Sequence, residues 1–132
     1  LDFPFWDIHD WRGQGAYGSG GHPREDTATM TLDDLEKIIS KRAQSDPSES
    51  WTAQLLSKGA EKCAEKFGEE AIELIIEVVK GDREKMISET ADVVFHLLVM
   101  LHARGVRVEE VLSELEARQS QSGLEEKRQR KG

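Results

Sequence analysis

Two pairs of acidic residues dominate the middle of the chain. One pair is Glu70 and Glu73, the other is Glu89 and Asp92, and within each pair the residues are three positions apart. Residues at this spacing share one face of an α-helix, so each pair presents two carboxylates side by side. Their repulsion costs roughly a few tenths of a kcal/mol and grows with burial, so a counter-charge is needed. Mg²⁺ suits such a site because it prefers oxygen ligands and keeps waters for a phosphate-bearing substrate.

The second pair precedes an almost continuous apolar run at positions 93–101, which is interrupted only by His96. A helix that is apolar on nearly all sides is buried, which places Glu89, Asp92 and His96 at or near a core. Buried carboxylates must be paired, protonated or bound to metal. The first pair, taken alone, fits an ordinary solvated helix face equally well.

The segment around the first pair also contains cationic groups. Lys62 and Lys66 lie one or two helical turns before the acids, where they could hold phosphate oxygens, and Glu69 and Glu77 extend the acidic face. A lone histidine on an apolar helix, such as His96, is as often structural as functional.

Composition limits the possible functions. The chain has 132 residues and a formal net charge of −8, which fits one domain and argues against a nucleic-acid binder. No stretch approaches the roughly 18 apolar residues that a membrane-spanning helix needs, so we expect no membrane partner. A single cysteine, Cys63, excludes an internal disulfide and fits a reducing cytoplasm.

The periodicity predicts an all-α fold of antiparallel helices. Residues 1–29 are rich in aromatic residues and glycine and read as an N-terminal extension, whereas 30–132 form the helical domain. Caps and breakers predict helices over 31–44, 51–57, 60–80, 82–104 and 108–118. In the second long helix, Ile75 and Val78 are expected to face inward. The helix at 82–104 is apolar on nearly all sides and would remain poorly covered in a single chain. We therefore expect a homodimer that completes the bundle.

Residues 31–128 resemble the phosphoribosyl-ATP pyrophosphatases of histidine biosynthesis, within a wider group of all-α nucleoside triphosphate pyrophosphatases. The matching stretches are WTAQLL at 51–56, KG at 58–59, EKFGEEAIE at 65–73, ETADVVFHLLV at 89–99 and SGLEEK at 122–127. The departures are conservative: Trp51 and Phe95 stand where tyrosine is common, and Phe67 where a smaller aliphatic residue is frequent. Residues 1–29 have no counterpart in the single-domain family.

The resemblance implies Mg²⁺-dependent hydrolysis of phosphoribosyl-ATP to phosphoribosyl-AMP and pyrophosphate. It implies a metal site made of Glu70, Glu73, Glu89 and Asp92, with Glu69 or Glu73 activating the water. The substrate-binding residues would be Lys58, Lys62, Lys66 and His96. Two alternatives stay open: a housecleaning nucleoside triphosphate pyrophosphatase with the same metal site, and a non-catalytic helical dimer.

Overall fold

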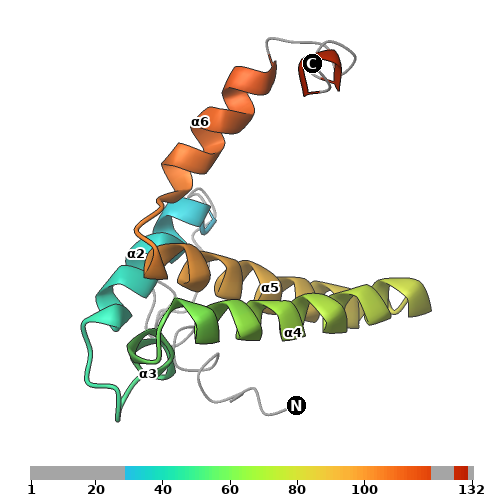
Figure 1. Ribbon diagram of the computed structural model, residues 1–132. Helices are drawn as coiled ribbons and strands as arrows, with labels where there is room; N and C mark the ends of the chain where they lie inside the picture. The colour runs from blue at the N-terminus through green and yellow to red at the C-terminus, as the bar shows by residue number, and fades with distance from the viewer. Residues whose placement is uncertain (1–28, 120–126, 131–132) are drawn as a thin grey trace.

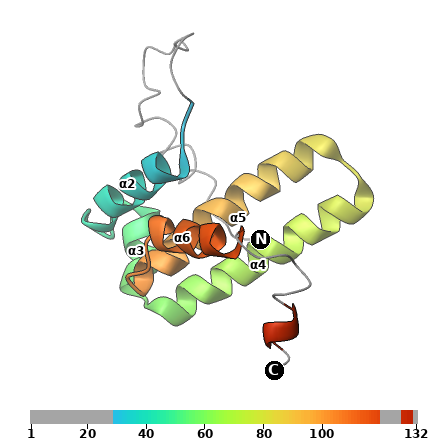
Figure 2. The same ribbon diagram turned by 90° about the horizontal axis from the view of Figure 1, so that it is seen from above.

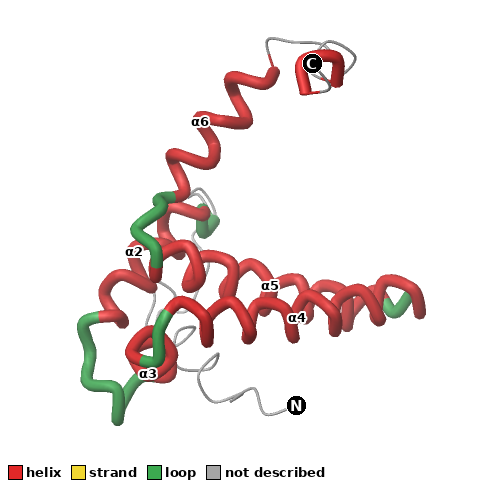
Figure 3. The backbone as a smooth tube through the Cα atoms, viewed as in Figure 1, coloured by secondary structure: helices red, strands yellow, loops and turns green. Residues whose placement is uncertain are grey.

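The computed structural model describes residues 29–119 and 127–130, and this part of the chain is helical without strands (Figures 1 and 3). Five helices of seven residues or more follow one another, joined by short connections: α2 (Leu32–Ala43), α3 (Trp51–Ser57), α4 (Ala60–Lys80), α5 (Arg83–Ala103) and α6 (Val108–Gln119). Residues 127–130 form one further helical turn. The all-α prediction is confirmed, and each predicted helix is present to within two residues at either end. The expected extension at 1–29 and most of the SGLEEK stretch lie outside the described residues.

Local chemistry accounts for where the helices begin and end. Thr31 caps α2 in a capping box, because its hydroxyl accepts from the Asp34 backbone N–H and the Asp34 carboxylate accepts from the Thr31 backbone N–H, both at 3.0 Å. Ser50 and Asp82 cap α3 and α5 through their side-chain oxygens, which accept from the backbone N–H groups of Ala53 and Lys85. Gly81 ends α4 with a φ of 81°, a left-handed conformation that favours glycine. The sharp turn at Gly81-Asp82 folds α5 back antiparallel to α4.

The two long helices form a hairpin whose far half projects beyond the rest of the molecule (Figures 1 and 2). At its base, α2 and α3 pack against the hairpin around a small core. The core residues are Leu35, Ile39, Leu55, Cys63, Phe95, Leu98, Val99 and Val108. Trp51 is partly buried and packs against this core. The hydrophobic core therefore fixes only one end of the hairpin.

The expected orientation of α4 is wrong for two residues. Ile75 and Val78 are 58% and 53% exposed, although their periodicity suggested that they face inward. The stripe of apolar residues on α4 is real, but the chain itself covers little of it. Periodicity identifies an apolar face without identifying the surface that buries it.

The expectation that no segment could span a membrane is also wrong on length and composition. α5 is long and apolar enough to cross a bilayer by these two criteria. The core helix of a soluble protein passes the same test, and α5 packs along α4 through a face that contains Glu89 and Asp92. We therefore interpret α5 as one half of the hairpin and not as a membrane-spanning helix.

A tertiary contact attaches α6 to α2. The backbone N–H of Val108, the first residue of α6, donates to Glu36 Oε2 at 2.8 Å, and Arg107 Nη2 lies 3.8 Å from Glu36 Oε1. One carboxylate thus satisfies a backbone donor at the start of a helix and balances a neighbouring cation. The rest of α6 extends away from the body (Figure 1).

Replacing Glu36 by alanine should therefore lower the free energy of unfolding by about 1 kcal/mol, because the Val108 donor loses its acceptor. Urea denaturation followed by circular dichroism would measure the change. Glu49→Ala, in the exposed α2–α3 connection, is the matched control. Equal midpoints for the two variants would show that the Glu36 contact contributes nothing.

Candidate metal centre

Three of the predicted carboxylates meet between α4 and α5. One oxygen each from Glu70, Glu89 and Asp92 lies within 4.8 Å of the other two. Glu70 comes from α4 and the other two from α5, so the antiparallel hairpin brings together residues that the sequence separates. This is the only group of that kind in the described part of the chain.

Burial and repulsion make this cluster electrostatically costly. Burial raises the pKa of Glu70, and the carboxylates of Glu89 and Glu73 raise it further, against the opposing effect of Lys66. Burial likewise raises the pKa of Glu89, with added repulsion from Glu73 and Glu77. The side chain of Glu70 is only 1% exposed. The site thus holds several carboxylates in a place that disfavours their charged forms.

Glu73 and Glu77 line the same side of the hairpin beyond the three-oxygen group. Glu73 was predicted as a fourth metal ligand, and its oxygen is not among the three that cluster. Its charge nevertheless acts on both Glu70 and Glu89. Glu77 was not predicted as a site residue, yet its side chain is 12% exposed and its charge raises the pKa of Glu89. Its spacing of seven from Glu70 was the signal in the sequence.

Lys66 is the cation that faces this acidic group. Its Nζ lies 3.6 Å from Glu70 Oε2 and 3.4 Å from Glu69 Oε1, at the four- and three-residue spacings of one helix face. Lys66 is buried, whereas Glu69 is nearly half exposed. The structure therefore places Lys66 inside the acidic site and Glu69 at its edge.

His96 lies one turn beyond Asp92 on α5 and is fully buried. Its ring meets the ring of Phe95 edge to face, with centroids 5.3 Å apart. Burial, and then the charge of Lys66, lower the pKa of His96 from 6.5 to about 3, so the imidazole is neutral at physiological pH. His96 is thus close enough to Lys66 for the lysine charge to lower the pKa of the imidazole.

The other two predicted substrate-binding lysines are exposed. Lys62 donates to Glu65 Oε1 at 2.9 Å on the solvent side of α4, and Lys58 ends α3. Both lie toward the base of the hairpin, on the N-terminal side of Lys66. The predicted cationic residues are therefore not equivalent: one is buried among the acids, and two are at the surface.

The donor set fits a hard divalent cation. Glu70 Oε2 and Glu89 Oε1 are buried and have no hydrogen-bond partner among the described residues. Three carboxylate oxygens within 4.8 Å of one another form the kind of oxygen donor set that Mg²⁺ prefers. A cation there would offset both the repulsion and the missing hydrogen bonds.

The fold and the carboxylate cluster define an all-α protein with a candidate divalent-cation centre between two antiparallel helices. Comparison with known families is more specific: residues 32–119 match the model of the phosphoribosyl-ATP pyrophosphohydrolase family. The chain belongs to this family.

Similar curated proteins are named phosphoribosyl-ATP pyrophosphatase. The protein from Roseobacter denitrificans is 62% identical over 101 residues, which cover 76% of this chain and 96% of the relative. The one from Ruegeria pomeroyi is 64% identical over 73% of this chain and 91% of its own length. The Paracoccus denitrificans protein is 57% identical over 86% of this chain and 99% of the relative. The chain therefore spans nearly the full length of each of these relatives.

The depressed pKa of His96 predicts an acid-sensitive fold. The unfolded chain protonates His96 near pH 6.5 and the folded chain only near pH 3, so this contribution to stability is lost as the pH falls between these values. From pH 7 to pH 5 the loss amounts to about 2 kcal/mol. Glu70 and Glu89 act in the opposite sense, because their raised pKa values make stability fall as the pH rises.

Comparing the wild type with His96→Gln isolates the histidine contribution. Denaturant unfolding in EDTA should show a shallower loss of stability toward pH 5 in the variant. His102→Gln on the same helix is the control and should follow the wild type. Parallel pH profiles for wild type and His96→Gln would contradict the assignment.

Proposed function

We propose that this chain hydrolyses phosphoribosyl-ATP to phosphoribosyl-AMP and pyrophosphate with Mg²⁺, the second step of histidine biosynthesis. The observation that carries the proposal is the cluster of Glu70, Glu89 and Asp92 in a chain of this family. The names of the similar proteins supply the substrate. The cluster supplies a place where a cation and a polyphosphate could meet.

Glu70, Glu89 and Asp92 would hold the Mg²⁺, which leaves Glu73 beside the site without a role as a ligand. The ion, when bound, supplies positive charge that neutralises phosphate oxygens as the anhydride breaks. The hairpin brings the carboxylates of α4 and α5 together in the chain itself, so the ligand oxygens already converge before the ion and substrate bind.

Glu73 is the better candidate for handling the attacking water. Glu69 is engaged by Lys66 at 3.4 Å and is exposed, whereas Glu73 is half-buried and faces both Glu70 and Glu89. The water oxygen would bond to a phosphorus of the α–β anhydride while its proton passes to the Glu73 carboxylate. The bridging P–O bond then breaks and pyrophosphate leaves.

The lysines would bind the negative charge of the substrate. Lys58 and Lys62 are exposed at the base of the hairpin, where a triphosphate and a phosphoribosyl group would need cations. His96 is neutral, so it would contact a phosphate oxygen or a carboxylate only as a hydrogen-bond donor from one ring nitrogen. An acidic chain of net charge −8 needs such local cations to bind a polyanion.

Pyrophosphate release tests the proposal, measured with phosphoribosyl-ATP beside ATP, dCTP and dUTP in Mg²⁺. We expect rapid release from phosphoribosyl-ATP alone, abolished by EDTA. Glu70→Gln should lower the rate at least about 100-fold, because it removes a ligand oxygen charge. Glu84→Gln, in the first turn of α5, is the control. Turnover of the plain triphosphates instead would indicate a housecleaning pyrophosphatase, and inactivity on all four would leave a non-catalytic bundle.

We propose further that the chain works as a homodimer. The hairpin exposes large apolar side chains on its outer faces: Ile72, Ile75, Ile76, Val78, Val79 and Ile87. Val79 is 81% exposed, and Gly68, one turn before Ile72, has open space where a Cβ would lie. A second copy would cover these faces and complete a four-helix bundle of the two hairpins.

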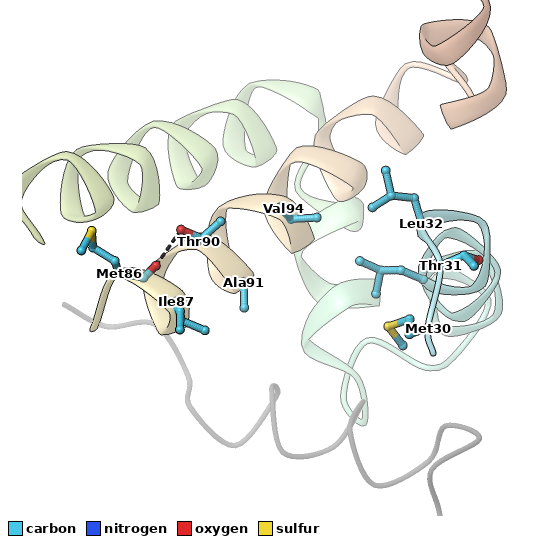
Figure 4. Close-up of a pocket in the computed structure, with 9 residues that line it drawn as sticks. Met30, Thr31, Leu32, Met86, Ile87, Thr90, Ala91 and Val94 are labelled. Carbon is cyan, nitrogen blue, oxygen red and sulfur yellow. Dashed lines mark hydrogen bonds between the residues drawn. The ribbon is translucent and has the colours of Figure 1, made fainter. Parts of the chain in front are cut away.

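An apolar groove lies beside the hairpin, on the side of α5 opposite the carboxylates. Met86, Ile87, Ala91 and Val94 line it from α5, and the start of α2 with the residues before it forms the other wall (Figure 4). Its volume is about 520 Å³. We expect the second copy to reach into it. An α5 buried in this way needs neither a membrane nor a nucleic-acid partner, and fits a cytoplasmic enzyme.

Substituting glutamate at Ile75 should dissociate the dimer, because it buries a charge at the centre of the proposed interface. Light scattering after gel filtration would give the mass of each species. Leu112→Glu places the same charge on the exposed stripe of α6 and should leave the dimer intact. Dissociation by Leu112→Glu alone would move the interface to α6.

A further inference from the structure

Lys66 differs from the other lysines of the hairpin in its burial and its partners. Its side chain is 9% exposed, against 45% for Lys62 one turn earlier. Its Nζ lies between Glu69 Oε1 at 3.4 Å and Glu70 Oε2 at 3.6 Å. A buried ammonium is costly to desolvate and persists only where anions compensate it. Lys66 is thus built into the acidic site rather than placed at its surface.

The carboxylate of Glu70 would consequently interact with two cations, Lys66 and the metal ion. Its Oε2 faces Lys66, and one of its carboxylate oxygens belongs to the group that would hold the metal. An ion bound to Glu70 would lie within a few ångströms of the Lys66 ammonium, and like charges at that distance repel strongly in a partly buried site. Lys66 and the metal therefore compete for the same carboxylate.

We propose that Lys66 is a positioning residue that weakens metal binding in the absence of substrate. This inference rests on the proposed metal site. Lys66 holds Glu70 in place before the ion arrives and keeps its charge compensated. The phosphate oxygens of the substrate then offer Lys66 new anionic partners and relieve its repulsion from the ion. Substrate and metal thereby each strengthen the binding of the other.

Two simpler roles for Lys66 make different predictions. A lysine that only contacts phosphate would leave the substrate-free affinity for metal unchanged. A lysine that only stabilises the fold would, when removed, loosen the site and weaken metal binding. Competition alone predicts that removing the charge makes the substrate-free site bind metal more tightly.

Mn²⁺ binding to the substrate-free protein, followed by electron paramagnetic resonance, tests this directly. Lys66→Met should bind Mn²⁺ about ten-fold more tightly than the wild type, because a unit charge near the ion is removed. Lys66→Gln should behave likewise, and Lys66→Arg, which keeps the charge, should stay close to the wild type. Lys37→Met removes an exposed lysine of α2 and is the charge-matched control.

Thermal unfolding provides the second measurement. Without its partner, the buried carboxylate of Glu70 should destabilise the metal-free variants, and Mg²⁺ should raise their midpoints more than that of the wild type. Unchanged or weaker Mn²⁺ binding by the folded Lys66→Met and Lys66→Gln proteins would overturn the inference. Failure of the wild type itself to bind Mn²⁺, or equal binding by Glu70→Gln, would instead reject the metal site on which it rests.

Discussion

Electrostatic repulsion among carboxylates buried between α4 and α5 is the main constraint on this structure. α4 and α5 face each other through acids, with Glu70 buried, Glu77 nearly so, and Glu89 and Asp92 opposite them. A helical hairpin ordinarily packs through apolar side chains and exposes its charges. Here the outer faces contain the apolar residues, including Ile75 and Val79. The arrangement is costly for an isolated chain, and that cost is the physical reason to expect a cation on the inside and a protein surface on the outside.

The charges between α4 and α5 change from the base of the hairpin toward its far end. At the base, where the hydrophobic core lies, burial keeps His96 neutral and leaves Lys66 as the buried cation. Beyond Lys66 the face is acidic from Glu70 to Glu77. Lys66 pairs with Glu70, Lys80 lies 3.9 Å from Glu77, and Lys85 partly offsets the charge of Glu89, yet repulsion among the carboxylates still raises the pKa values of Glu70 and Glu89. The three carboxylate oxygens converge on this acidic face.

Much of this could be predicted from the sequence because the relevant signals are local. Thr31, Ser50 and Asp82 mark helix starts by hydrogen bonds within a single turn, and the three-residue spacing places each acidic pair on one face. The remainder depends on contacts between distant segments. The Glu36–Val108 hydrogen bond joins residues 72 positions apart, and no local pattern encodes it. The prediction for Ile75 was wrong because carboxylates such as Glu70 occupy the inner face of α4, against the usual preference for burying apolar side chains.

The acidic inner face of the hairpin and its apolar outer face are also expected to influence each other. A cation bound between α4 and α5 would remove the repulsion between their carboxylates, and in the proposed dimer a second copy would cover Ile75 and Val79 on the outside. Each stabilises the same closed hairpin, so each should raise the affinity for the other without any contact between them. The far half of the hairpin, which lacks a hydrophobic core of its own, is where this coupling must act. In the proposed dimer, the second copy would help to set the geometry of the carboxylates.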